Sequence, residues 1–209
     1  MLIVGVICAY LTGAIPFAYI FTKLTKGQDI REEGSKNVGA TNVLRVAGKK
    51  IALLVLALDM LKGVVAAGFL SSFFSKFTII SHINIRLLFA TMAVVGHIWP
   101  VFLNFKGGKG VATTLGVCLG LGFYLPEFRF LILTTIFTWF LLFIITRYVS
   151  VGSMAAALSL PLIAAFVGFD FKIVLVCVTL AGLVIFKHHE NIRRLITKRE
   201  TKLYFGRSS

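Results

Sequence analysis

The feature that most constrains this chain is a series of long apolar runs that carry almost no charge. A helix needs about 20 apolar residues to cross the hydrocarbon core of a bilayer, with roughly 17–25 as the usual range. Because backbone N–H and C=O groups find no water at that depth, each run is expected to be α-helical. The candidate spans are Leu2–Thr22, Ile51–Phe74, Leu87–Phe105, Val111–Leu125, Phe130–Thr146, Val151–Gly168 and Phe171–Phe186. The fourth and seventh are short, and they span only if the helix continues into its loops or the bilayer thins.

Composition places the chain in the same class. Hydrophobic residues make up 58% of the 209 residues, whereas a water-soluble domain is typically about 45–50% apolar. We therefore predict an all-α, polytopic membrane protein with seven transmembrane helices. No internal repeat and no Pro- or Ser-rich linker divides residues 1–209, so they are expected to form one integral membrane domain. The first run lacks the basic start of a cleaved signal peptide and is expected to be retained.

The positive charge lies in the connections between the apolar runs. The formal net charge is +14, and its placement in short loops favours anionic lipid and an anionic substrate over nucleic acid. Of the 22 Lys and Arg residues, seventeen fall on one side of a seven-span arrangement and Lys62 falls within a span. The other side receives only Lys76, Arg86, Arg129 and Lys172. This asymmetry predicts an outside N-terminus and a cytoplasmic C-terminus, with loops 23–50, 104–110 and 147–150 and tail 187–209 in the cytoplasm. A re-entrant fourth segment would leave six spans and would spoil the asymmetry.

The first polar segment, GSKNVGATNVLR, runs from Gly34 to Arg45 between two apolar runs. Gly34 and Gly39 permit backbone conformations that other residues avoid, and Lys36 and Arg45 are cations. Backbone N–H groups and cations in such a loop can hold phosphate oxygens. On this stretch alone, a solvated loop with ordinary turn residues is an equal alternative.

The second polar segment, GHIWPVFLNFKGGKGVATT, runs from Gly96 to Thr114. Its Lys106–Gly110 turn directly precedes a predicted helix, and free N–H groups and the positive end of the helix dipole both favour an anion there. It is not a P-loop, because Gly110 follows Lys109 where that motif has Ser or Thr. A tight turn with cytoplasmic lysines is the less favoured alternative.

The third polar segment, KHHENIRRL, runs from Lys187 to Leu195 after the last apolar run. His188 and Asn191 would share one face of a helix, and His188 is a candidate general base or phosphate ligand. The alternative is a basic segment that touches anionic lipid, and it is favoured for the arginines.

Other polar groups give weaker indications. Asp59 and Lys62 lie three residues apart within a predicted span, where ionisable residues indicate either function or a structural ion pair. Cys8, Cys118 and Cys177 stand alone in apolar runs, so neither a disulfide framework nor a metal site is expected.

These motifs together resemble the bacterial family of acyl-phosphate:glycerol-3-phosphate acyltransferases. The resemblance rests on GSKNVGATNVLR, GHIWPVFLNFKGGKGVAT, HHENIRRL and the Asp59 to Gly63 segment, and it covers Leu2 to about Thr197. Val38 is a mild variation from the family pattern, and the tail from Lys198 has no clear counterpart in it.

The resemblance implies a multi-pass enzyme of the bacterial inner membrane with its active site at the cytoplasmic face. It would transfer a fatty acyl group from acyl phosphate to the 1-hydroxyl of sn-glycerol 3-phosphate, giving lysophosphatidic acid and phosphate. No cofactor or metal is implied; the partners are membrane lipid and a soluble enzyme that makes the acyl phosphate. Thioester-dependent acyltransferases commonly carry Asp five residues after a His, and none of His82, His97, His188 and His189 shows this pattern.

The family motifs also imply the site residues. The catalytic positions would be Ser35, Arg45, Lys109, His188 and Asn191. The substrate-binding positions would be Gly34, Lys36, Asn37, Gly39, Thr41, Asn42, Lys106, Gly107, Gly108 and Gly110.

A mechanism follows in outline. Acyl phosphate is an activated mixed anhydride, so positioning two phosphorylated substrates accounts for much of the catalysis. We expect the glycine turn and Ser35 to bind one phosphate, and Arg45 and Lys109 to help bind the other. Either His188, oriented by Asn191, or the substrate's own phosphate accepts the hydroxyl proton.

Two other classes of protein share some of these features. A transporter for organic phosphate would also need helices and cationic loops, but it would usually place ionisable groups near the membrane midplane and contain repeats. A membrane-anchored assembly factor would not need three phosphate-type segments.

Overall fold

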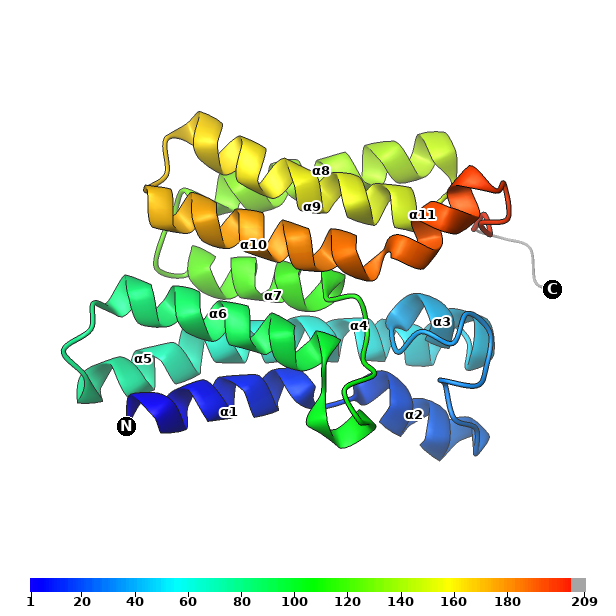
Figure 1. Cartoon of the computed structure of the whole chain (residues 1–209), viewed down its shortest axis with the longest axis horizontal. Helices are drawn as coiled ribbons and strands as arrows, with labels where there is room; N and C mark the ends of the chain where they lie inside the picture. The colour runs from blue at the N-terminus through cyan, green and yellow to red at the C-terminus, as the bar shows by residue number, and fades with distance from the viewer. Residues whose placement is uncertain (204–209) are drawn as a thin grey trace. The chain divides into compact units, whose positions relative to one another are not determined.

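The computed structural model describes residues 1–203, which form helices joined by short loops and contain no strand. The helices gather into two compact units, one over residues 1–129 and one that begins at residue 130 (Figure 1). The prediction of an all-helical chain is confirmed for the described residues. A single domain over residues 1–209 stays a prediction, and the end of the predicted cytoplasmic tail, residues 204–209, lies outside the described part.

The first unit contains α1 to α7 and the second contains most of α8 and the helices after it. In the first unit the elements are α1 (Leu2–Ala14), α2 (Phe17–Lys26), α3 (Ala40–Val46), α4 (Lys49–Val64), the π-helix η1 (Val65–Leu70), α5 (Ser71–Phe74), the 3₁₀ turn η2 (Ser75–Phe77), α6 (His82–Ile98), the 3₁₀ turn η3 (Val101–Leu103) and α7 (Val111–Gly122). In the second they are α8 (Phe128–Thr146), α9 (Val149–Val167), α10 (Phe171–Lys187) and α11 (His189–Ile196). All seven predicted apolar runs are largely helical.

The first predicted span is broken in two. Pro16 has no N–H for a helical hydrogen bond and disfavours helical geometry in the residue before it. Accordingly α1 ends at Ala14, Ile15 is extended with ψ 118°, and α2 begins at Phe17. At the break, the carbonyl oxygen of Ile15 accepts a hydrogen bond from Lys62 Nζ of α4 at 3.1 Å.

The third predicted span is displaced. Residues Leu87–Phe105 were expected to be helical, but α6 starts earlier, at His82, and ends at Ile98. Pro100 does not continue the helix, and Asn104 and Phe105 both take left-handed conformations with φ 51° and 61°. The end of the predicted run is therefore a folded loop, which carries the glycine turn back to the end of α6.

Glycines set the closest helix contacts of the first unit. There α1 packs on α6, and α4 packs on α7 (Figure 1). A Cβ on Gly116 of α7 would lie 2.0 Å from the Met60 carbonyl oxygen of α4, and one on Gly13 of α1 would lie 2.0 Å from the Ala93 carbonyl oxygen of α6. Small residues let helices in lipid approach this closely. Gly116 is therefore a residue at which α4 and α7 pack.

Fewer than the seven expected spans are found when helices are counted by length and apolar composition. Among the described residues, five helical stretches are long and apolar enough to cross a membrane, and a sixth arises if α10 and α11, bent by 55°, count as one. The remaining apolar helix, α7, has 12 residues and so measures about 18 Å, less than the roughly 30 Å hydrocarbon core. Seven spans and the orientation of the termini stay predictions.

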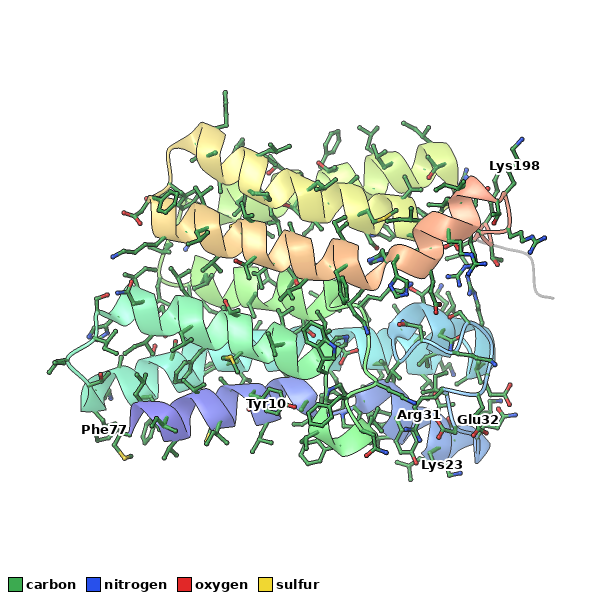
Figure 2. All side chains as sticks on the ribbon, in the orientation of Figure 1. Tyr10, Lys23, Arg31, Glu32, Phe77 and Lys198 are labelled. Carbon is green, nitrogen blue, oxygen red and sulfur yellow. The ribbon has the colours of Figure 1, made fainter. Side chains whose placement is uncertain are left out.

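Charged side chains of the first unit gather toward one end. Figure 2 shows Lys23, Arg31 and Glu32 at the end formed by α2 and the loop after it, and Phe77 at the opposite end. The predicted site residues of this unit lie on that loop, on α3 and on the glycine turn.

Candidate active site

Asn42 holds the first loop in shape from within. Its side chain is 1% exposed, and its Oδ1 accepts the Ser35 N–H at 2.8 Å. Its Nδ2 donates to the carbonyl oxygens of Ile30, Glu33 and Asn37 at 3.2, 2.9 and 3.1 Å. One residue of α3 thus joins four points of the preceding loop. The predicted role of Asn42 in shaping this loop takes the form of an internal clamp.

Three backbone N–H groups of this loop, which were expected to be available to an anion, donate to acceptors in the loop or to Asn42. The Ser35 N–H is bound by Asn42, the Lys36 N–H donates to Glu33, and the Gly39 N–H donates to Asn37. These N–H groups are therefore used inside the loop. The side chains that this segment can offer to an anion are the Ser35 hydroxyl and the cations Lys36 and Arg45, and both cations are exposed.

Left-handed backbone shapes the same loop. Gly34 has φ +55°, and a Cβ there would lie 2.4 Å from Asn42 Oδ1. Lys36 also has a positive φ, 59°, which is uncommon for a residue with a side chain and costs free energy. Thr41 is half-buried in the first turn of α3.

The second loop folds against the end of α6. The N–H of Gly107 donates to the Ile98 carbonyl, and that of Gly108 donates to the His97 carbonyl. A Cβ on Gly107 would lie 2.2 Å from the His97 carbonyl oxygen, so only glycine fits there. Gly110 has φ +83° and precedes α7, which begins at Val111 as predicted.

The first turn of α7 can bind an anion. The first N–H groups of a helix have no partner within it, and the helix dipole places partial positive charge there. The hydroxyls of Thr113 and Thr114 in this turn are buried and have no hydrogen-bond partner among the described residues. Lys109 is half-buried and Lys106 is exposed beside the turn.

The two loops of the first unit meet. A Cβ on Gly108 would lie 2.5 Å from the carbonyl oxygen of Val38, in the middle of the first loop. Val38, Gly107 and Gly108 also line one small cavity together with Pro16 at the α1–α2 break. The structure therefore brings the first and second motifs together, as the resemblance implies.

A buried charge cluster lies beneath these loops. Asp59 and Lys62 of α4 form an ion pair of 2.8 Å between Oδ1 and Nζ, and His97 Nδ1 of α6 lies 3.6 Å from the same Oδ1. The three residues are 2%, 4% and 7% exposed. They line the same cavity as the two loops. The sequence indicated the Asp59–Lys62 pair, but nothing in it indicated that His97 joins the pair.

His188 occupies a bend in the second unit. It is 2% exposed and ends α10, and the direction changes by 55° before α11. Its Nδ1 lies 2.7 Å from the Val184 carbonyl oxygen. A carbonyl only accepts hydrogen bonds, so we assign the proton to Nδ1, which makes Nε2 the basic nitrogen of the neutral ring.

Asn191 binds a residue of the tail. It was expected to share one helix with His188 and orient it, but the helix breaks at His188, and the Asn191 Nδ2 donates to Glu200 Oε1 at 2.6 Å. Ser150 of α9 donates to the same oxygen at 2.8 Å, and Arg194 Nε donates to Oε2 at 2.7 Å. Burial raises the pKa of Glu200, but hydrogen bonds from Arg194, Asn191 and Ser150 outweigh it and hold this pKa below its usual range. Glu200 was not expected to matter, because its partners come together only when the tail folds back.

Fold and sites together define a polytopic helical membrane protein with glycine-rich, cationic loops suited to phosphate. A family model described as glycerol-3-phosphate acyltransferase matches residues 3–198. The chain therefore belongs to the glycerol-3-phosphate acyltransferase family, and it is an acyltransferase of phospholipid synthesis.

Individual relatives agree with this assignment. The chain is 43% identical to the glycerol-3-phosphate acyltransferase of Syntrophomonas wolfei over 198 residues, which cover 95% of this chain and 94% of the relative. It is 44% identical to the enzyme of that name from Bacillus cytotoxicus, with 95% and 93% covered.

A solved structure is also similar. The crystal structure of PlsY (YgiH), an integral membrane glycerol 3-phosphate acyltransferase, in its glycerol 3-phosphate form is 39% identical, with a TM-score of 0.85 and coverage of 97% of this chain and 96% of that one. The lysophosphatidic acid form of PlsY is 37% identical, with a TM-score of 0.82 and coverage of 97% and 95%.

Proposed function

We propose that this chain transfers a fatty acyl group from acyl phosphate to the 1-hydroxyl of sn-glycerol 3-phosphate, producing lysophosphatidic acid and inorganic phosphate. The observation that carries the proposal is the contact of two cationic loops, through Val38 and Gly108, beside the first turn of α7. Each substrate carries a phosphate, so the reaction needs two neighbouring anion sites.

The residues divide between these two phosphates. The first turn of α7, with the Thr113 and Thr114 hydroxyls, offers polar groups to one phosphate together with Ser35. Arg45 and Lys109 help to bind the other. The remaining proposed binding residues hold the loops in shape or add charge: Gly34, Lys36, Asn37, Gly39, Thr41, Asn42, Lys106, Gly107, Gly108 and Gly110.

The chemistry is acyl transfer to an alcohol. The 1-hydroxyl oxygen forms an ester bond with the acyl carbon, and the anhydride C–O bond breaks, so that phosphate leaves with the bonding electrons. An activated donor needs no covalent acyl-enzyme, and fixing both substrates can contribute roughly 7–11 kcal/mol. The sequence lacks the His-to-Asp spacing of five residues that is common in thioester-dependent acyltransferases, which agrees with a different donor. A soluble enzyme would supply that donor.

His188 is the proposed acceptor of the hydroxyl proton. Its Nδ1 faces the Val184 carbonyl, which leaves Nε2 as the basic nitrogen. The alternative acceptor is the substrate's own phosphate, with His188 and Asn191 serving only to position it. In His188→Ala the first mechanism predicts that kcat at saturating substrates falls by about 10²–10⁴-fold. If kcat survives and only KM rises, the phosphate is the acceptor.

The asymmetry of Lys and Arg supports a location and an orientation. We infer a bacterial inner-membrane protein with seven spans, in which α7 is the short one, an outside N-terminus and a cytoplasmic C-terminus. The three motifs would then all face the cytoplasm.

The deciding experiment uses the purified full chain in detergent with glycerol 3-phosphate and palmitoyl phosphate. We expect phosphate release and lysophosphatidic acid in equal amounts, and neither product with palmitoyl-CoA. A reaction without glycerol 3-phosphate measures donor hydrolysis alone. Activity with palmitoyl-CoA but not with palmitoyl phosphate would reject the proposed donor.

A further inference from the structure

The stability of the fold does not by itself require the three buried ionisable residues Asp59, Lys62 and His97. All three are buried in the helices of the first unit, where removing charges from water is expensive unless they are paired. Apolar residues of similar volume often replace a buried ion pair without loss of stability. A structural ion pair alone therefore does not account for three ionisable groups at this place.

Lys62 and His97 contact backbone outside the helices near the proposed site, and Asp59 contacts both of them. Lys62 Nζ donates to the carbonyl oxygen of Ile15 at 3.1 Å, where Pro16 ends α1. The His97 carbonyl accepts the Gly108 N–H at 3.1 Å. A Cβ on Gly108 would lie 2.3 Å from His97 Nε2, so the ring packs directly on the glycine turn.

These contacts form a continuous path. It runs from the α1–α2 break through Lys62 to Asp59, and from Asp59 through His97 to the turn that presents Lys109. The carbonyl oxygen of Val38 and the His97 ring both lie where a Cβ on Gly108 would stand, so the first loop, the ring and the turn meet at this glycine. The cavity lined by these residues has room for roughly one water molecule, so the cluster and the turn are closely packed.

We propose that His97 is a positioning residue that sets the height and angle of the Gly107–Lys109 turn, and that the Asp59–Lys62 pair anchors its ring. The inference rests on the proposed function of that turn in binding a substrate phosphate. His97 does not touch the reacting atoms in this account; it acts through the turn.

The test measures kcat and both KM values in His97→Leu and His97→Asn, with the thermal midpoint of each purified protein. The matched control is His82→Leu, because His82 lies exposed at the opposite end of the same helix. We expect His97→Leu to lose about 100-fold in kcat/KM for one phosphorylated substrate, because a displacement of about 1 Å at a site costs that much. Its thermal midpoint should stay within about 3 °C of the parent. In His97→Asn the new side-chain amide can still donate to Asp59. The kcat/KM of this variant should therefore be at least tenfold higher than that of His97→Leu.

Unchanged kcat/KM in folded His97→Leu would overturn the proposal, and so would a loss fully explained by the fraction of unfolded protein. If neither His97 variant folds, the double variant Asp59→Asn/Lys62→Met decides, because it removes both charges together and leaves His97 in place. A lowered kcat/KM in that folded variant supports positioning, and the parental value rejects it. If the parent chain itself transfers no acyl group from palmitoyl phosphate, the proposed function fails; binding of glycerol 3-phosphate by parent and His97→Leu then tests the positioning role alone.

Discussion

At the residue scale, the Asn42 side chain makes four hydrogen bonds that a substitution can remove. Its amide nitrogen serves three loop carbonyls, and its oxygen holds the Ser35 N–H. In Asn42→Asp the oxygen remains but the donors are lost, and a carboxylate faces carbonyl oxygens. We expect the loop to lose about 2 kcal/mol, or roughly 30-fold in its opening equilibrium.

Limited trypsin digestion after the exposed Lys36 measures this opening. Cleavage in Asn42→Asp should be about 30-fold faster than in the parent. Asn104→Asp is the control, because Asn104 is exposed and lies outside this loop. Equal cleavage rates in both variants would contradict the clamp.

At the element scale, glycine decides how closely α4 and α7 approach. In Gly116→Ala the new Cβ would lie 2.0 Å from the Met60 carbonyl oxygen, so the helices must separate. Overpacking of this kind should lower the thermal midpoint by roughly 5 °C. The control is Gly182→Ala in α10, where a Cβ meets nothing within 4 Å and should leave the midpoint unchanged or slightly raised. Equal midpoints for the two variants would show that α4 and α7 tolerate separation.

The tail of the second unit depends on a single carboxylate. Glu200 has a lowered pKa in the folded chain, so its contribution is complete above the unfolded value of about 4.3 and is lost as the pH falls through the folded pKa. The Leu203 N–H, which donates to the Arg147 carbonyl, should therefore exchange faster below about pH 4 after correction for intrinsic rates. In Glu200→Gln the same amide should already exchange faster at pH 7. Equal protection in parent and variant would show that other contacts hold the tail.

At the scale of the whole molecule, the proposed topology makes a prediction about access. Single cysteines replace exposed residues in a chain whose Cys8, Cys118 and Cys177 have been substituted. Lys36→Cys, Lys106→Cys and Glu190→Cys should react with an impermeant thiol reagent only after the cells are permeabilised. Lys76→Cys and Lys172→Cys should react in intact spheroplasts. Reaction of Glu190→Cys from outside would place the third motif on the wrong membrane face.

The helical regions and the start of α7 could be predicted from the amino-acid sequence. Apolar runs with little charge predicted seven stretches that are largely helical, because in lipid a chain must satisfy its own backbone hydrogen bonds. The Lys106–Gly110 turn predicted the start of α7 at Val111, and the motifs predicted the family. Boundaries failed at Pro16 and Pro100, where the expected helices break or end.

Partners between distant segments could not be predicted. The amino-acid sequence by itself determined an all-helical membrane chain of this family, with glycine-rich basic loops, since those features depend on neighbouring residues and on side-chain chemistry. Only the tertiary structure decided that Asn42 consumes the Ser35 N–H, that His97 joins Asp59 and that Glu200 binds Asn191. Each of these contacts depends on how the helices pack and how the loops fold back. A local pattern of residue types contains no information about that packing.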